Sequence, residues 1–135
     1  MDESCCRSTS RFRSELSKLR KKYENIEDDI KAEFHSVPFI DLFNWNYRLQ
    51  DAGNYRLIKR RISNSHNQTG KSGGFRIYYI ANLVEEKVTF LTIYPKSNNM
   101  GKDNLKKEIL KQILSEFKKE NSEKVLADIN FEKIL

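Results

Sequence analysis

Residues 55–83 read YRLIKRRISNSHNQTGKSGGFRIYYIANL and predict two β-strands joined by a polar loop. Residues 55–63 and 75–83 are rich in β-branched and aromatic side chains, whereas residues 64–74 hold the polar residues and glycines that separate strands. A third strand is expected at residues 88–95, VTFLTIYP, after a turn at Glu85-Glu86, and Pro95 suits the end of a strand. Successive strands with such connections predict an antiparallel meander.

Helical patterns flank this meander on both sides. Apolar residues recur at steps of three and four before it, at Phe12, Leu16, Leu19, Tyr23, Ile26, Ile30 and Phe34. This stripe predicts an amphipathic helix with one break near Asn25, ended by Pro38. A second helix is expected around Leu105, Ile109, Leu110, Ile113, Leu114 and Phe117, with Asp103 or Asn104 as its N-cap.

The remaining segments carry weaker patterns. Residues 1–11 are expected to form a flexible N-terminus, residues 35–54 an irregular aromatic segment, and residues 118–135 a short helix or a loosely docked tail. The chain of 135 residues suits one domain. The prediction is therefore a single α+β domain over residues 1–135, with a small antiparallel sheet, an N-terminal helix or helical hairpin and a C-terminal helix.

Composition excludes several classes of protein. No apolar run approaches the roughly 18 residues that span a bilayer, and the N-terminus lacks the apolar segment of a secretory signal, so a cytoplasmic location is expected. Adjacent Cys5 and Cys6 are poorly placed to bridge each other and belong to no zinc motif, so two reduced thiols are expected. The acidic run Glu27-Asp28-Asp29 suits a helix surface, so neither a metal nor another cofactor is expected.

The net charge of +6 arises in one segment. Residues 55–76 contain six cations and no carboxylate, whereas the rest of the chain is balanced: the cations are Arg56, Lys59, Arg60, Arg61, Lys71 and Arg76. Six uncompensated cations repel one another, so a polyanionic partner is a physical reason to keep them together. The alternative is a solvated basic strand and loop without a partner.

The Gly-Lys-Ser sequence at residues 70–72 does not fit a nucleotide-binding loop. That loop needs a glycine five residues before Gly70, where this chain has Ser65, and it leads from a strand into a helix. Here Gly73 and Gly74 lead into a strand, and glycine at such a point permits a tight turn or a close approach of another backbone.

Strand alternation places some of these cations together. Phe75, Ile77 and Tyr79 face one way and Arg76, Tyr78 and Ile80 the other, while Lys59 and Arg61 share a face of the preceding strand. If the two strands pair across the loop, Lys59, Arg61 and Arg76 converge on one concave patch, with Lys71 at its rim.

The segments KRRISNSHNQTGKSGGFRIYYI, VTFLTIYPKS and KDNLKKEIL, in this order, resemble the RelE/HigB-type toxins of bacterial type II toxin–antitoxin modules. The resemblance covers residues 57–117 well and residues 12–34 loosely. It implies a compact antiparallel sheet with two N-terminal helices and a C-terminal helix. It also implies a ribonuclease that cuts messenger RNA on the ribosome and is neutralised by a cognate antitoxin.

Carried over by position, the resemblance assigns catalytic roles to Lys59, Arg61, Arg76 and Lys96. Metal-independent cleavage uses the ribose 2′-OH as nucleophile and needs charge stabilisation and proton transfer. Arginine forks match phosphate oxygens, which suits Arg61 and Arg76, and Lys59 or Lys96 would stabilise charge or transfer a proton. Further RNA contacts are expected from Arg56, Arg60, Lys71, Tyr94 and His66.

Two departures from the family pattern keep other readings open. Some members carry a catalytic tyrosine in the C-terminal helix, but residues 101–120 contain no tyrosine, and Ser97 follows Lys96 where some relatives have arginine. The first alternative is a non-catalytic relative that binds RNA or protein. The second is a ParE-like toxin that binds gyrase, although such a toxin needs no phosphate-cleaving cluster.

Overall fold

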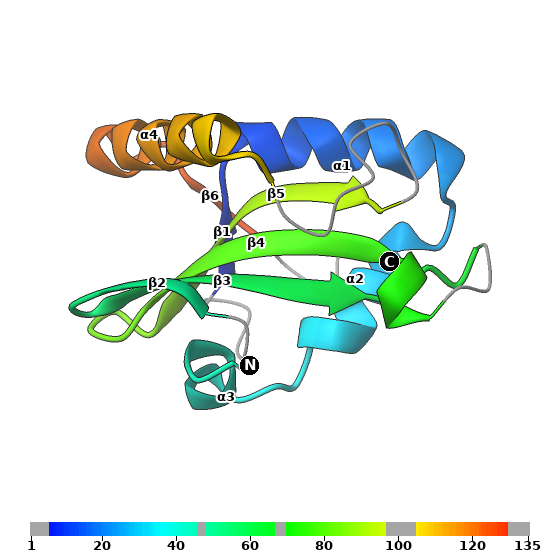
Figure 1. Cartoon of the computed structure of the whole chain (residues 1–135), viewed down its shortest axis with the longest axis horizontal. Coiled ribbons are helices and arrows are strands. Elements are labelled where there is room, and N and C mark those ends of the chain that lie inside the picture. The colour runs from blue at the N-terminus through cyan, green and yellow to red at the C-terminus, as the bar shows by residue number, and fades with distance from the viewer. Residues whose placement is uncertain (1–5, 46–47, 67–69, 97–104, 130–135) are drawn as a thin grey trace.

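The computed structural model describes residues 6–45, 48–66, 70–96 and 105–129, and of Ser72 only the backbone. These residues form an α+β fold with a six-stranded open sheet, as Figure 1 shows. The strands, in sheet order, are β2 (Arg48–Ala52), β3 (Tyr55–Ile62), β4 (Phe75–Asn82), β5 (Lys87–Pro95), β1 (Cys6–Ser8) and β6 (Ala127–Asp128). The helices are α1 (Ser10–Lys22), α2 (Ile26–Phe34), α3 (Phe39–Phe43), α4 (Lys107–Glu123) and a 3₁₀ turn, η2 (Lys71–Gly73).

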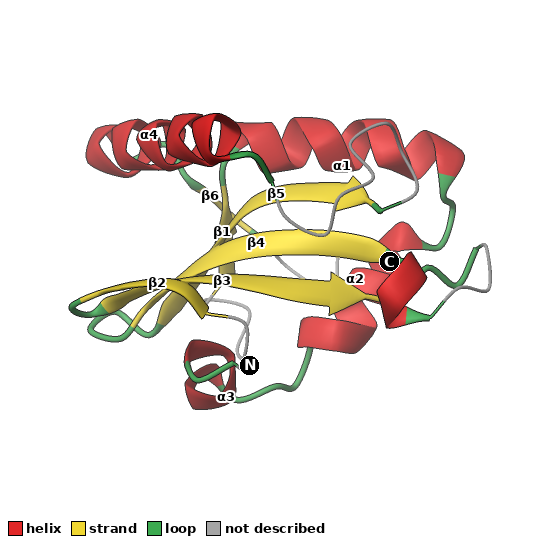
Figure 2. Cartoon of the chain, viewed as in Figure 1, coloured by secondary structure: helices red, strands yellow, loops and turns green. Residues whose placement is uncertain are grey.

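The predicted meander is confirmed. β2, β3, β4 and β5 pair antiparallel in chain order, with Pro95 at the end of β5. β5 then pairs with β1 in parallel, and β6 pairs antiparallel with β1 at the far edge. Figure 2 shows the three long strands as the body of the sheet, with the short strands beside them.

The expectation of a flexible N-terminus is wrong for residues 6–11. Cys6, Arg7 and Ser8 form β1, and the Cys6 side chain is fully buried in the core. Cys5 lies outside the described residues. Thr9 then caps α1 by accepting a hydrogen bond from the Phe12 backbone N–H at 3.3 Å. The segment therefore anchors α1 to the sheet beside β5.

The two faces of the sheet carry separate cores. Helices α1, α2 and α3 cover one face, where the larger core includes Phe12, Ile30, Phe34, Ile77, Tyr79 and Phe90. Helix α4 covers the other face, where a smaller core joins Leu57, Tyr78, Ile80, Leu91, Tyr94, Ile113 and Phe117. The alternation of Ile77 and Tyr79 against Tyr78 and Ile80 confirms the predicted facing of β4.

Several predicted boundaries are confirmed and others are wrong. The predicted break near Asn25 separates α1 from α2, and residues 83–86 form the turn before β5. The N-cap of α4 is Lys106, so the expectation of Asp103 or Asn104 is wrong. α4 also runs on to Glu123, six residues beyond Phe117.

The segments expected to be irregular contain regular elements. The described part of residues 35–54 includes α3 and β2, and the segment after α4 returns to the sheet as β6. Lys124, with φ of 59°, turns the chain after α4 towards β6. None of the described helices combines the length and the apolar character that crossing a bilayer requires.

Candidate functional site

Strand register brings three of the predicted cations onto one face of the sheet. Lys59 lies opposite Tyr78 and Arg61 opposite Arg76 in the β3–β4 pair, while Arg76 lies opposite Tyr94 in the β4–β5 pair. Directly opposed residues of an antiparallel pair point to the same face with Cβ atoms about 5 Å apart. Lys59, Arg61 and Arg76 therefore form what we call the cationic cluster.

The cationic cluster occupies one end of the face that α4 covers at its other end. Leu57 and Ile80 continue the same rows of β3 and β4 and lie in the core beneath α4. Tyr78 joins the two regions, because its hydroxyl accepts a hydrogen bond from the Leu105 backbone N–H at 3.0 Å. The chain thus enters α4 beside the hydroxyl of Tyr78, the residue that pairs with Lys59 in the sheet.

Arg76 is held by the backbone of the glycine-rich turn. It is fully buried, and its Nη1 donates to the Lys71 carbonyl at 2.9 Å and to the Phe75 carbonyl at 3.2 Å. A buried guanidinium needs such acceptors to offset the loss of water. Lys59 is also buried, at 3% exposed, whereas Arg61 is half-buried.

Gly74 brings three strand ends together at this place. A Cβ at position 74 would lie 1.9 Å from the Ile62 carbonyl oxygen at the end of β3. The Gly74 carbonyl accepts from the Lys96 N–H at 3.0 Å, just beyond β5. The expected close backbone approach at this glycine pair is confirmed, and Lys96 lies at the same end of the sheet as Arg61 and Arg76.

Arg56 and Arg60 lie on the opposite face of the sheet from the cationic cluster. Arg60 is 5% exposed, with its Nε 3.4 Å from Glu33 and its guanidinium 3.8 Å from the Trp45 ring centroid. Arg56 donates to the Asn44 side chain at 2.6 Å and stacks 4.0 Å from the Phe43 ring centroid. The structure does not bring these two arginines to the cluster and gives them packing contacts with α2, α3 and the segment that follows α3.

Lys71 and His66 lie at the margin of this arrangement. The Lys71 Nζ is 2.9 Å from Glu33 on α2, although its backbone carbonyl holds Arg76. The His66 ring packs edge-on against Tyr23, with centroids 5.9 Å apart, on the side of α1. Neither side chain is directed by these contacts to the cationic cluster.

The tyrosines divide between the two faces. Tyr78 and Tyr94 share the face of the cluster, with ring centroids 6.2 Å apart, and are 1% and 4% exposed. Tyr79 lies in the other core, where its hydroxyl donates to the Leu42 carbonyl at 2.8 Å and burial raises its pKa. Tyr94 is thus adjacent to Arg76 in the sheet.

The arrangement suits binding of an oxyanion. Arg61 and Arg76 lie directly opposite each other, and guanidinium groups bind oxyanions through paired N–H donors. Across the part of the chain that the structure describes, no three His, Cys, Asp or Glu side chains are grouped as metal ligands would be. Neither a protein-family model nor a curated protein matches this chain.

Proposed function

We propose that this chain is a toxin of the RelE/HigB type, with the fold of that family, and that it cleaves messenger RNA on the ribosome. A cognate antitoxin would be its protein partner and the cytoplasm its place of action. The observation that carries the proposal is the register of β3, β4 and β5. It gathers Lys59, Arg61, Arg76 and Tyr94 on one face, at the end of the sheet where Lys96 follows β5.

The chemistry of the proposed reaction needs no metal. The ribose 2′-OH attacks the neighbouring phosphorus, the bond from phosphorus to the 5′-oxygen breaks, and a 2′,3′-cyclic phosphate and a 5′-hydroxyl form. Arg61 and Arg76 would stabilise the negative charge of the phosphorane. Lys59 and Lys96 would stabilise charge further or move the proton between the two oxygens.

A second candidate is a non-catalytic RNA-binding protein with the same surface. Arg76 is fully buried, and its Nη1 donates to two backbone carbonyls, which suits a structural arginine that supports the turn before β4. The sequence of α4 also supplies no tyrosine for proton transfer. Under this candidate the half-buried Arg61 contacts the phosphate without turnover.

Cleavage of a message in a translating extract separates the two candidates. Primer extension after addition of wild-type protein should reveal discrete cuts that depend on translation and disappear when an inhibitor of initiation is added first. Lys59→Ala and Arg61→Ala should each lower the cleavage rate by about 10²-fold or more, the cost of removing one group that stabilises a transition state. Lys21→Ala, an exposed cation in the last turn of α1, is the control and should cleave at the wild-type rate.

Thermal melting of each variant distinguishes a lost group from a lost fold. Intact messages with well-folded wild-type protein would reject the enzyme and leave the binding candidate. Equal cleavage by Lys21→Ala and Arg61→Ala would show that the cationic cluster has no catalytic role.

A further inference from the structure

Helix α4 differs in charge between its two flanks, because three of its glutamates lie beside α1, together with Lys119. Ile113 and Phe117 face the sheet. On the flank towards α1, Glu116 binds Arg11 and Glu120 binds Ser10, and Glu123 lines the groove between the two helices. The α4 residues that line the pocket on the opposite side, towards β2 and β3, include Lys118 and no glutamate.

That opposite flank carries a row of lysines. Lys118 lines a pocket between α4 and the β2–β3 hairpin, and Lys111 and Lys107 lie seven and eleven residues before it, two and three helical turns away on the same side. All three are exposed, and none of them has an ion-pair partner among the described residues. We call Lys107, Lys111 and Lys118 the lysine row. Its spacing follows from the sequence of α4 once the buried side of the helix is known.

The lysine row connects the cationic cluster to the pocket. Leu105, two residues before α4, donates to the hydroxyl of Tyr78, which lies opposite Lys59. From Lys107 to Lys118 the helix rises about 16 Å. A polyanion with one charged group at the cationic cluster would therefore meet further cations if it extended along this flank.

The pocket at the far end of the row has a volume of about 340 Å³. Tyr55, Phe117 and Leu114 supply aromatic and aliphatic walls, while Gln50, Asn121 and Ser122 supply amides and a hydroxyl. An unstacked nucleobase needs this combination, because its faces stack on apolar groups and its edges make hydrogen bonds. Tyr55 is 39% exposed, so part of the wall is open to a ligand.

We propose that the lysine row and this pocket bind a single-stranded stretch of the same RNA whose scissile phosphate lies at the cationic cluster. The lysines neutralise successive phosphates, and the pocket takes one unstacked base and so gives the protein a base preference. This inference rests on the proposed function for its choice of RNA as ligand. The extension of the lysine row over three helical turns favours RNA over an acidic peptide, which would need only the pocket and its nearest cation.

Binding of a fluorescein-labelled 12-nucleotide RNA of mixed sequence, followed by anisotropy in EDTA, tests the row. The triple variant Lys107→Ala, Lys111→Ala, Lys118→Ala should bind at least ten-fold more weakly than wild type. A plot of the logarithm of its association constant against the logarithm of salt concentration should be less steep by about 2. Each phosphate contact with a single strand contributes about 0.7 to that slope. The matched control, Lys18→Ala, Lys21→Ala, Lys22→Ala on α1, removes the same charge from exposed positions and should leave the slope unchanged. Equal losses in the two triple variants would overturn the proposal.

Filling the pocket tests the base site. Ser122→Trp places an indole into the pocket from an exposed helix position, and Ser122→Leu serves if the first variant melts early. Wild type should discriminate among four homopolymeric 12-mers, and the filled pocket should bind all four alike. Discrimination that survives filling would overturn the base site. Preferential capture of a labelled leucine–glutamate peptide, lost in Ser122→Trp, would replace RNA by a protein partner.

The binding experiments can fail independently of the cleavage experiment. RNA bound through the lysine row without any cut message would overturn only the catalytic part of the proposed function. Messages cut equally well by wild type and the α4 triple variant, with equal RNA affinity, would overturn only this inference.

Discussion

Position 74 shows how one missing side chain can fix the geometry of a site. Gly74 has a negative φ of −91°, so a left-handed conformation is not the reason for glycine. The reason is space, because the Ile62 carbonyl oxygen and the Asn64 backbone N approach to 1.9 Å and 2.9 Å of the place of a Cβ. This close approach sets the turn whose carbonyls hold Arg76.

Gly74→Ala should therefore destabilise the protein far more than Gly70→Ala. An added methyl group at position 74 must push two backbones apart, at a cost of about 1–3 kcal/mol or more. At position 70 no atom lies within 4 Å of the added Cβ, and the extended backbone accepts alanine. Urea unfolding of the two variants measures the difference. Similar midpoints for both would show that the β3–β4 ends do not approach as described.

For single residues, the sequence predicts which face of the sheet a side chain occupies but not which residue it contacts. The alternation of Arg76 with Phe75 and Ile77 was enough to place the arginine on the face opposite the larger core. The same rule separates Arg60 from Lys59 and Arg61, although Arg60 was expected to make further contacts with the same RNA. The partner of Arg60 is Glu33, 27 residues earlier, and no local pattern predicts that contact.

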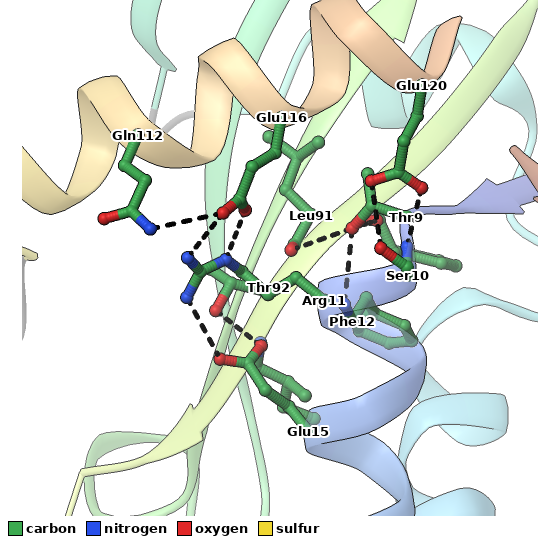
Figure 3. A network of polar contacts seen from close by, with 12 residues as sticks. Thr9, Ser10, Arg11, Phe12, Glu15, Leu91, Thr92, Gln112, Glu116 and Glu120 are labelled. Carbon is green, nitrogen blue, oxygen red and sulfur yellow. Dashed lines mark hydrogen bonds and ion pairs between the residues drawn. The ribbon is translucent and has the colours of Figure 1, made fainter. Parts of the chain in front are cut away.

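Among the elements, the pairing of α1 with α4 depends on polar contacts that the sequence did not single out (Figure 3). Arg11 donates from Nε and Nη2 to the two carboxylate oxygens of Glu116, at 2.6 Å and 2.9 Å. Glu15 accepts from the Thr92 hydroxyl at 2.7 Å and from the Ile93 N–H at 3.1 Å, just after β1 stops pairing with β5. Glu15 thus accepts hydrogen bonds from the edge of β5 beyond the residues with which β1 pairs.

The two glutamates should respond to pH in opposite directions. The hydrogen bond from Arg11 lowers the pKa of Glu116, so its stabilising effect is present above the unfolded pKa and is lost as pH falls through the folded value. Burial raises the pKa of Glu15 despite its hydrogen bonds, so its contribution is present below the unfolded pKa and is lost as pH rises through the folded value.

Melting temperatures of Glu116→Gln and Glu15→Gln between pH 4 and pH 7 test this pair. Glu116→Gln should lower the melting temperature at pH 7, by the equivalent of about 1 kcal/mol or less for a partly exposed pair, and approach wild type in acid. Glu15→Gln keeps an oxygen acceptor for Thr92 and Ile93 without the buried charge, so it should raise the melting temperature at pH 7 and lose that advantage in acid. Both substitutions change net charge equally. Shifts of the same sign would therefore point to net charge and contradict the local account.

Helices and strands were predicted correctly where a periodic pattern extends over many residues. The prediction failed for short strands that form only because a neighbouring strand pairs with them. The three meander strands have eight or nine residues of strand-like composition and were found nearly to the residue. β1 has three residues, Cys6–Ser8, and is a strand because the edge of β5 is available to it. β2 is exposed throughout and carries no buried pattern, so only its pairing with β3 defines it.

For the whole molecule, the unequal cores on the two faces of the sheet predict unequal resistance to opening. The sheet and helices α1 to α3 share the larger core, whereas α4 contributes two buried residues, Ile113 and Phe117, to the smaller one. The face that α4 covers is also the one that bears the buried Lys59 and Arg76. A helix held by few buried side chains and by partly exposed polar contacts opens locally before the domain unfolds.

Hydrogen exchange followed by mass spectrometry should therefore show two protection classes. Amides of α4 should exchange faster than those of β4 and β5, which lie in the middle of the sheet and are buried along their length. Glu116→Gln should speed exchange in α4 and leave β4 unchanged, because the contact with Arg11 joins α4 to α1 without touching the strand. The control is Gln112→Ala, which removes only a 3.3 Å bond within α4 and should have a smaller effect. Equal protection of α4 and β4, or a uniform loss of protection in Glu116→Gln, would contradict this account. Either result would mean that the domain opens as one cooperative unit, so that Lys59 and Arg76 become exposed only on global unfolding.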